Sequence, residues 1–156
     1  MNDSSQRLIN DCSNDINKIK KWIDDNPTDS LIQYLVPYAV VRASGTIEYV
    51  FKQMIYDYLS AEAGKDTKTY LEHAIIDSSS NPTTSMIARV IQDFDEKKAE
   101  TFRASLSSEE KHHLNSLVSS RNDVAHGRNI NASINSVITE LKAGIGILLK
   151  LEQVLS

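Results

Sequence analysis

Residues 31–59 read LIQYLVPYAVVRASGTIEYVFKQMIYDYL, and apolar side chains recur through this stretch at steps of three and four residues. That period is typical of an amphipathic α-helix, and we predict one long helix over about residues 30–62. Its apolar stripe is wide enough to face two neighbouring helices. Pro37 is expected to kink the helix near its start, because proline removes a backbone donor and crowds the preceding turn. Gly45 and the small residues around it indicate a close helix approach or a mild bend.

The same period predicts further helices on both sides of this stretch. They cover about residues 4–25, 67–77, 83–94, 96–105, 107 to 122 or 124, and 132–155. Local signals at the helix ends support these limits. Asp29 or Ser30 is expected to cap the long helix, and Ser107 with Glu110 matches a capping box. Gly127 follows the fifth of these helices at the place where a left-handed residue is wanted.

The segment SSSNP at 78–82 predicts a turn, because serine and asparagine side chains bond nearby backbone and proline fixes φ. No convincing alternation of apolar and polar residues predicts a strand. We therefore expect an all-α fold, an up-and-down helical bundle of four to five main helices with short extra helices. No repeat or low-complexity linker divides the chain, so residues 1–156 are expected to form a single domain.

Composition limits the classes of function. The chain has 156 residues, a formal net charge of −4 and one cysteine, Cys12. A single cysteine allows neither an internal disulfide nor a multi-cysteine metal site, which favours a cytoplasmic protein. No apolar run reaches the roughly 18 residues of a membrane span, and no secretory signal is expected. The negative charge argues against a protein that coats nucleic acid, since such binding needs many cations. A small local site for one phosphate stays compatible with it.

A polar stretch, SSRNDVAHGRN at 119–129, separates the last two long helical patterns and places Arg121 five residues before His126. One interpretation is structural: both residues are cations near a helix C-terminus, where the helix dipole favours them. The other is a site. On a continuous helix the two residues lie about 140° apart around the axis. To act on one substrate, either the helix ends between them or two subunits bring their copies together.

The two residue types suit the cleavage of RNA without a metal. Histidine titrates near neutral pH and exchanges protons with a reacting group. Arginine stays charged and presents a planar fork of donors to phosphate oxygens. In this chemistry the ribose 2′-OH attacks the adjacent phosphorus. His126 would act as base or acid, and Arg121 would stabilise the charge that builds on the phosphoryl oxygens.

The stretch SSRNDVAHG resembles the signature of the HEPN superfamily, an arginine followed after four to six residues by histidine, with a polar residue directly after the arginine. Arg121, Asn122 and His126 hold those positions. The resemblance implies an all-α bundle, usually homodimeric, whose two motifs face each other. It implies a metal-independent endoribonuclease without a cofactor, in a toxin–antitoxin or anti-phage defence setting with RNA as substrate and an antitoxin or defence partner. Asn122 would orient one of the catalytic residues, and Arg128 would steer the RNA backbone.

This sequence departs from part of the family pattern. Some HEPN toxins carry a tyrosine two residues after the histidine, where a partner nucleotidyltransferase modifies them. Arg128 holds that place here, so that pairing is not implied. The alternative function is a non-catalytic helical dimerisation or RNA-binding module that kept the motif for packing. A plain structural bundle is the weaker third reading.

Two other places carry residues with possible chemistry. Glu48 lies in an apolar stretch, and an ordinary i,i+4 pair with Lys52 is favoured over a site role in which it bonds Arg42 or Arg121. The run at 109–113, EEKHH, has the Glu-x-x-His spacing of di-iron bundles. Such sites need a second motif and further glutamates on other helices, so we predict no metal site.

Overall fold

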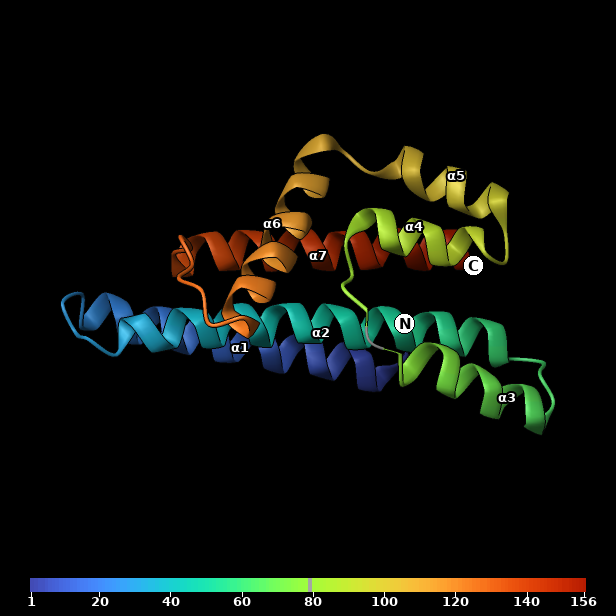
Figure 1. Cartoon of the computed structure of the whole chain (residues 1–156), viewed down its shortest axis with the longest axis horizontal. Coiled ribbons are helices and arrows are strands. Elements are labelled where there is room, and N and C mark those ends of the chain that lie inside the picture. Colours follow the sequence, from blue (N-terminus) through green and yellow to red (C-terminus); the bar gives the residue numbers. More distant parts are fainter. Residues whose placement is uncertain (79) are drawn as a thin grey trace.

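The computed structural model describes residues 1–78 and 80–156, and in that part of the chain every regular element is helical (Figure 1). The elements are α1 (Asp3–Asp25), α2 (Ile32–Ser60), α3 (Lys65–Leu71), the π-helical turn η1 (Glu72–Ile76), α4 (Thr84–Gln92), α5 (Glu96–Ser105), α6 (Ser108–Ala125) and α7 (Ile134–Leu155). The predicted all-α bundle with short extra helices is confirmed.

Helix α2 is the centre of the bundle. Figure 1 shows α1, α2 and α7 as three long rods that run side by side. Helix α6 crosses α7 obliquely and reaches α2 with its C-terminal end, α4 overlaps α7 in this view, and α5 lies above them. The apolar side chains of α2 enter one continuous core. Its fully buried members include Ala39, Val40, Ala43, Ile47, Val50 and Ile55. The prediction that this helix faces more than one neighbour is confirmed, because α1, α6 and α7 all pack against it.

Side-chain caps explain where most helices begin. Asn2, Thr83, Asp95, Ser107 and Ser133 each accept a bond from a backbone N–H in the first turn that follows. Those N–H groups have no partner within the helix, so an accepting side chain oxygen fixes the first residue. The predicted capping box of α6 is confirmed.

The start of α2 differs from the prediction. Its cap is Leu31, which offers no side-chain oxygen, and not Asp29 or Ser30. The carboxylate of Asp29 instead accepts a bond of 2.8 Å from the backbone N–H of Leu31, two residues on. This short local bond makes a turn ahead of the helix and delays its first residue to Ile32. From there α2 continues through Pro37 to Ser60.

The region predicted as a short helix at 67–77 contains two elements. Helix α3 begins at Lys65, and its last turn widens into η1, where the N–H of Asp77 bonds the carbonyl of Glu72 at 3.1 Å. The predicted turn at 78–82 includes Ser79, which lies outside the described residues.

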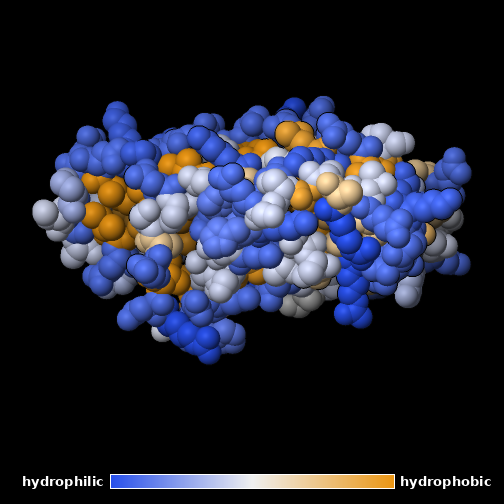
Figure 2. Space-filling view, turned by 90° about the horizontal axis from the view of Figure 1, so that it is seen from above, coloured by the Kyte–Doolittle hydropathy of each residue, from blue (hydrophilic) through white to orange (hydrophobic). Residues whose placement is uncertain are grey.

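Viewed from above, the molecule is mostly hydrophilic, and hydrophobic residues show in separate areas between the polar ones (Figure 2). Among the described residues, no helix combines the length and the apolar character that crossing a membrane requires.

Candidate site at the end of helix α6

Helix α6 ends in two backbone bonds that close its last turn. His126 is the cap residue, and Gly127 has a φ of 68°, the left-handed conformation predicted for it. The N–H of Gly127 bonds the carbonyl of Val124 at 3.0 Å, and the N–H of Arg128 bonds that of Asp123 at 2.8 Å. This pair of bonds is the Schellman motif. The last helical residue is therefore Ala125, and His126 follows it as the cap.

The end of α6 decides how the two candidate catalytic residues lie. The N–H of His126 still bonds the carbonyl of Asn122 at 3.1 Å, so the cap residue keeps its place on the last turn, about 140° around the helix axis from Arg121. The side chain of His126 is exposed at the helix end, whereas Arg121 is half-buried along its side. The helix ends between the two residues, at Ala125, but this end does not bring their side chains to one face. Pairing with a second copy of the chain stays a prediction.

Arg121 is held by two asparagines. One of its terminal nitrogens donates to the side-chain oxygen of Asn122 at 3.4 Å and to that of Asn81 at 3.3 Å. The bond to Asn122 joins the two residues, and the orienting role expected for Asn122 stays a prediction. Asn81 lies 40 positions earlier in the chain, and no local pattern in the sequence pointed to it.

Arg128 forms an ion pair with Asp123 in α6, the helix that it follows. Its guanidinium lies 3.3 Å from the carboxylate of Asp123 while its side chain stays 70% exposed. It also lines a hollow of about 270 Å³ whose other wall includes Gln33 and Pro37 of α2. This arginine is accessible to a phosphate, but a bound phosphate would compete with Asp123.

Glu48 and the run at 109–113 have ordinary partners. Glu48 lies 2.8 Å from Lys52, the predicted i,i+4 pair, and Arg42 bonds Asp15 on α1 instead. His113 approaches Glu109 at 3.6 Å. Within residues 1–78 and 80–156, no group of three or more His, Cys, Asp or Glu side chains is placed to hold a metal ion.

A buried carboxylate was missed by the sequence analysis. Glu140 of α7 is only 6% exposed, and one of its oxygens accepts a bond of 2.8 Å from Ser116 on α6. The other oxygen is buried without a partner among the described residues. Burial raises the pKa of Glu140, opposed by the Ser116 bond and by His113 and His112. The sequence does indicate this burial, because Glu140 lies between Val137 and Leu141 on the apolar side of its helix.

The fold assigns the chain to the class of all-α helical bundles, with a polar motif at the end of the penultimate long helix. Comparison with known families is more specific. The family RiboL-PSP-HEPN matches residues 3–155, and the chain belongs to this HEPN-type family. No curated protein and no solved structure matches the chain.

Proposed function

We propose that the protein is a metal-independent endoribonuclease of HEPN type. The observation that carries the proposal is the end of α6, in a chain of a HEPN-type family, where Arg121, Asn122 and His126 all occur. His126 is exposed there, and Arg121 donates to Asn122 and Asn81. An exposed proton carrier and a positioned phosphate-binding cation are the two groups that the reaction requires.

The proposed reaction is an internal transfer at phosphorus. The ribose 2′-oxygen bonds the adjacent phosphorus, the bond to the 5′-oxygen breaks, and the products carry a 2′,3′-cyclic phosphate and a 5′-hydroxyl. A base takes the 2′-OH proton, and an acid gives a proton to the leaving 5′-oxygen. His126 fills one of these roles, Arg121 binds the phosphoryl oxygens, and Arg128 attracts the RNA backbone.

The active unit in this proposal is a homodimer. Because His126 caps α6 about 140° around the helix axis from Arg121, one chain presents the two residues in different directions, and a second copy supplies the opposing pair. We extend the proposal to a toxin–antitoxin or anti-phage defence setting on the strength of the superfamily resemblance. With Arg128 where some HEPN toxins carry a tyrosine, the chain has no hydroxyl for modification at that position.

The test is cleavage of RNA by the purified protein in EDTA, compared with His126→Ala. Histidine at this position exchanges the proton, so we expect a loss of at least about 100-fold in rate. His73→Ala is the matched control. His73 is also exposed, but it lies in η1 and not in α6, and it pairs with Asp77. We expect the control to keep full activity.

The proposed activity is supported if the wild type and His73→Ala both give products with 2′,3′-cyclic phosphate ends and His126→Ala does not. No cleavage of any RNA by the wild type, or equal cleavage by His126→Ala, would overturn it. Cleavage that requires added metal would also contradict the proposed chemistry.

The second candidate function is a non-catalytic RNA-binding or dimerisation module. It is favoured because residues of the motif already stabilise the end of α6. His126 caps the helix, and Arg128 both closes the Schellman motif and pairs with Asp123. In this case RNA binds without being cut, and Arg128→Ala weakens binding while His126→Ala does not.

A further inference from the structure

Helix α2 carries a proline at a position where it breaks the pattern of backbone bonds. Pro37 is the sixth residue of α2, beyond the first turn, and the helix continues through it to Ser60. Proline has no backbone N–H, so the carbonyl of Gln33, four residues earlier, lacks the donor that an α-helix normally gives it. An interior proline is also the residue that a helix tolerates least. The start of α2 therefore carries a backbone acceptor that the helix does not pair.

This acceptor lies at a hollow beside the candidate site. The hollow, of about 270 Å³, lies between the start of α2 and the loop that follows α6. Gln33 and Pro37 both line it, and because they are four residues apart they share a face of α2. The open carbonyl of Gln33 points along the helix between them. Arg128, two residues after the cap His126, lies at the other wall of the hollow.

Other polar groups at this hollow are accessible as well. The side chains of Gln33 and Asn129 are exposed, and each carries an amide oxygen and two N–H donors. Asn129 and Ile130 lie outside any helix, and their N–H groups enter none of the backbone bonds of the described residues. The rest of the lining is largely apolar and includes Ile32, Val36, Ile130 and Ala132. A flat ligand with apolar faces and hydrogen-bonding edges fits this lining.

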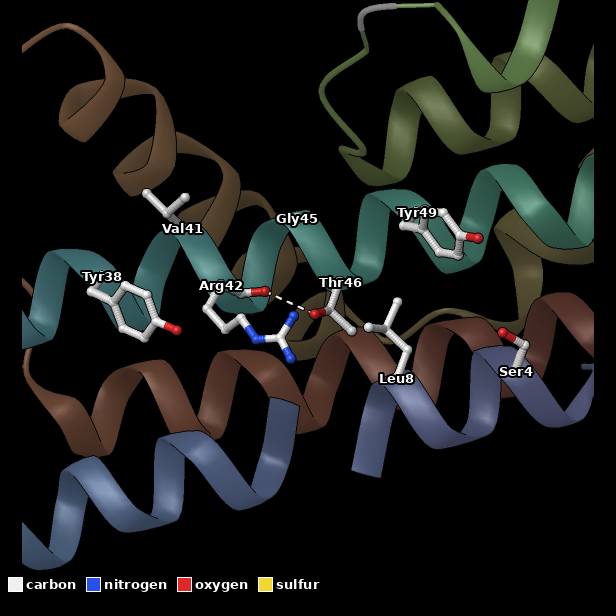
Figure 3. Close-up of a pocket in the computed structure, with 8 residues that line it drawn as sticks. All are labelled: Ser4, Leu8, Tyr38, Val41, Arg42, Gly45, Thr46 and Tyr49. Carbon is white, nitrogen blue, oxygen red and sulfur yellow. Dashed lines mark hydrogen bonds between the residues drawn. The ribbon is translucent and has the colours of Figure 1, made fainter. Parts of the chain in front are cut away.

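A larger hollow between α1 and α2, of about 510 Å³, differs in its cation (Figure 3). The guanidinium of Arg42 lies 3.4 Å from Asp15 on α1, and the side chain is only 29% exposed, against 70% for Arg128. The hydroxyl of Thr46 donates to the carbonyl of Arg42 at 2.9 Å, the bond that Figure 3 marks. Arg42 is thus engaged inside the fold, and the smaller hollow offers the more accessible cation.

We propose that the hollow at Arg128 binds one unpaired base of the RNA, an adenine or a cytosine, an inference that rests on the proposed function. The pairing edge of both bases has an exocyclic amine beside a ring nitrogen that accepts a bond. The amine has two N–H groups, and the hollow offers two kinds of acceptor, the carbonyl of Gln33 and the side-chain amide oxygens. The ring nitrogen accepts from a side-chain amide or from the N–H of Asn129 or Ile130.

Uracil does not match the same groups. It presents a carbonyl oxygen where adenine and cytosine present the amine, and this oxygen would lie against the open carbonyl of Gln33. Two acceptors that face each other leave both without a donor, and a site built for a donor rejects a ligand that lacks it. The hollow therefore discriminates between bases and does not only bind them.

The place of the hollow relates this base to the cleaved bond. A nucleotide whose base lies inside sets its phosphate near the exposed Arg128. The volume of about 270 Å³ is below the roughly 300–1,000 Å³ of sites for drug-sized ligands, which suits one base and not two. His126 lies two residues before Arg128. The base in the hollow thus belongs to a nucleotide close to the one that is cut.

The first test measures binding without cleavage. Oligonucleotides of 2′-O-methyl adenosine, cytidine or uridine cannot react, because the attacking hydroxyl is blocked. Their Kd for the wild-type protein is measured by fluorescence anisotropy. We expect the adenosine and cytidine oligonucleotides to bind at least about fivefold more tightly than the uridine one, the low end of what a well-paired base edge supplies. Equal binding of the three, no binding of any, or tightest binding of uridine overturns the proposal.

Two substitutions remove the two acceptors separately. Gln33→Ala removes the side-chain amide, and Pro37→Ala supplies the N–H that pairs with the carbonyl of Gln33. Each is expected to lower the preference over uridine by about fivefold. Gln153→Ala is the control, because Gln153 is an exposed glutamine of α7 outside the lining of the hollow, and it should keep the preference. An unchanged preference in both test variants, or an equal loss in Gln153→Ala, contradicts the proposal.

Pro37→Ala also separates recognition from folding. The restored helix bond is expected to raise the Tm, measured by circular dichroism, while the base preference falls. Damage to the fold would lower both quantities together. A Pro37→Ala protein with a higher Tm and the full preference overturns the role given to the carbonyl of Gln33.

The same samples separate this inference from the proposed enzyme. Cleavage of RNA by a wild type that binds the three oligonucleotides equally removes the base site and keeps the enzyme. A preference that Gln33→Ala abolishes, in a protein that cuts no RNA, keeps the base site and removes the enzyme.

Discussion

Glu140 shows how much depends on where a single residue lies. Its carboxylate is buried between α6 and α7, with one oxygen bonded to Ser116 and the other without a partner among the described residues. A carboxyl group whose pKa is raised by burial binds its proton more tightly in the folded chain than in the unfolded one. Stability from this residue is therefore highest in acid, and it falls as the pH rises from the ordinary value of 4.5 toward the raised folded value.

We predict that Glu140→Gln stabilises the protein at pH 8 by about 1 kcal/mol, because it removes a buried charge and keeps an acceptor for Ser116. The gain is expected to vanish near pH 4, where the wild-type carboxyl is protonated. Urea unfolding at the two pH values measures both. Glu62→Gln, at an exposed position, is the control and should change neither. A less stable Glu140→Gln at pH 8 would show that the ionised carboxylate stabilises the fold.

At the scale of elements, helix α6 joins local and long-range interactions at its start. Glu110 closes the capping box by accepting a 2.8 Å bond from the N–H of Ser107, and both of its oxygens lie 2.6 Å from the ammonium of Lys150 on α7. The Lys150 bond is the main cause of the lowered pKa of Glu110. The capping box was predictable, because its members are three residues apart. Lys150 was not, because it lies 40 residues away.

We predict that Glu110→Gln lowers stability at pH 7 by about 0.5–1 kcal/mol, since glutamine keeps the capping box but loses the ion pair. The folded pKa of Glu110 lies below its ordinary value of 4.5, so the ion pair stabilises the fold above that value. Its contribution disappears as the pH falls through the folded pKa. Thermal unfolding should show a larger difference at pH 7 than at pH 3. Glu109→Gln, whose side chain is 83% exposed, provides the comparison.

At the scale of the whole molecule, the two glycines of α7 show how closely this helix approaches its neighbours α2 and α6. At Gly144 an added Cβ would lie 2.9 Å from Cδ1 and 3.0 Å from Cγ1 of the fully buried Ile47. At Gly146 the nearest atom would be an oxygen of Glu110 at 3.8 Å, an ordinary contact. The first glycine sets the distance between α7 and α2, and the second does not.

We predict opposite effects for the same substitution at these two positions. Gly146→Ala is expected to stabilise the protein by about 0.5–1 kcal/mol through helix propensity. Gly144→Ala should destabilise it by on the order of 1 kcal/mol, because crowding in a packed core outweighs that gain. Adding Ile47→Val removes Cδ1, so the double variant should lose less than the sum of the single losses. Equal stability of the two alanine variants would mean that α7 moves away freely.

The sequence by itself determined the helices, the capping box of α6, the left-handed Gly127 and the position of the motif at the end of α6. These features depend on period and on side chains within about four residues, which the chain carries locally. Only the tertiary structure decided that Asn81 bonds Arg121 and that Glu140 is buried against Ser116. It also decided which glycine is used inside the chain: Gly144 meets α2, and Gly45 is left open. Glycine has the same local properties at both positions, and the difference arises from how helices far apart in the sequence dock against one another.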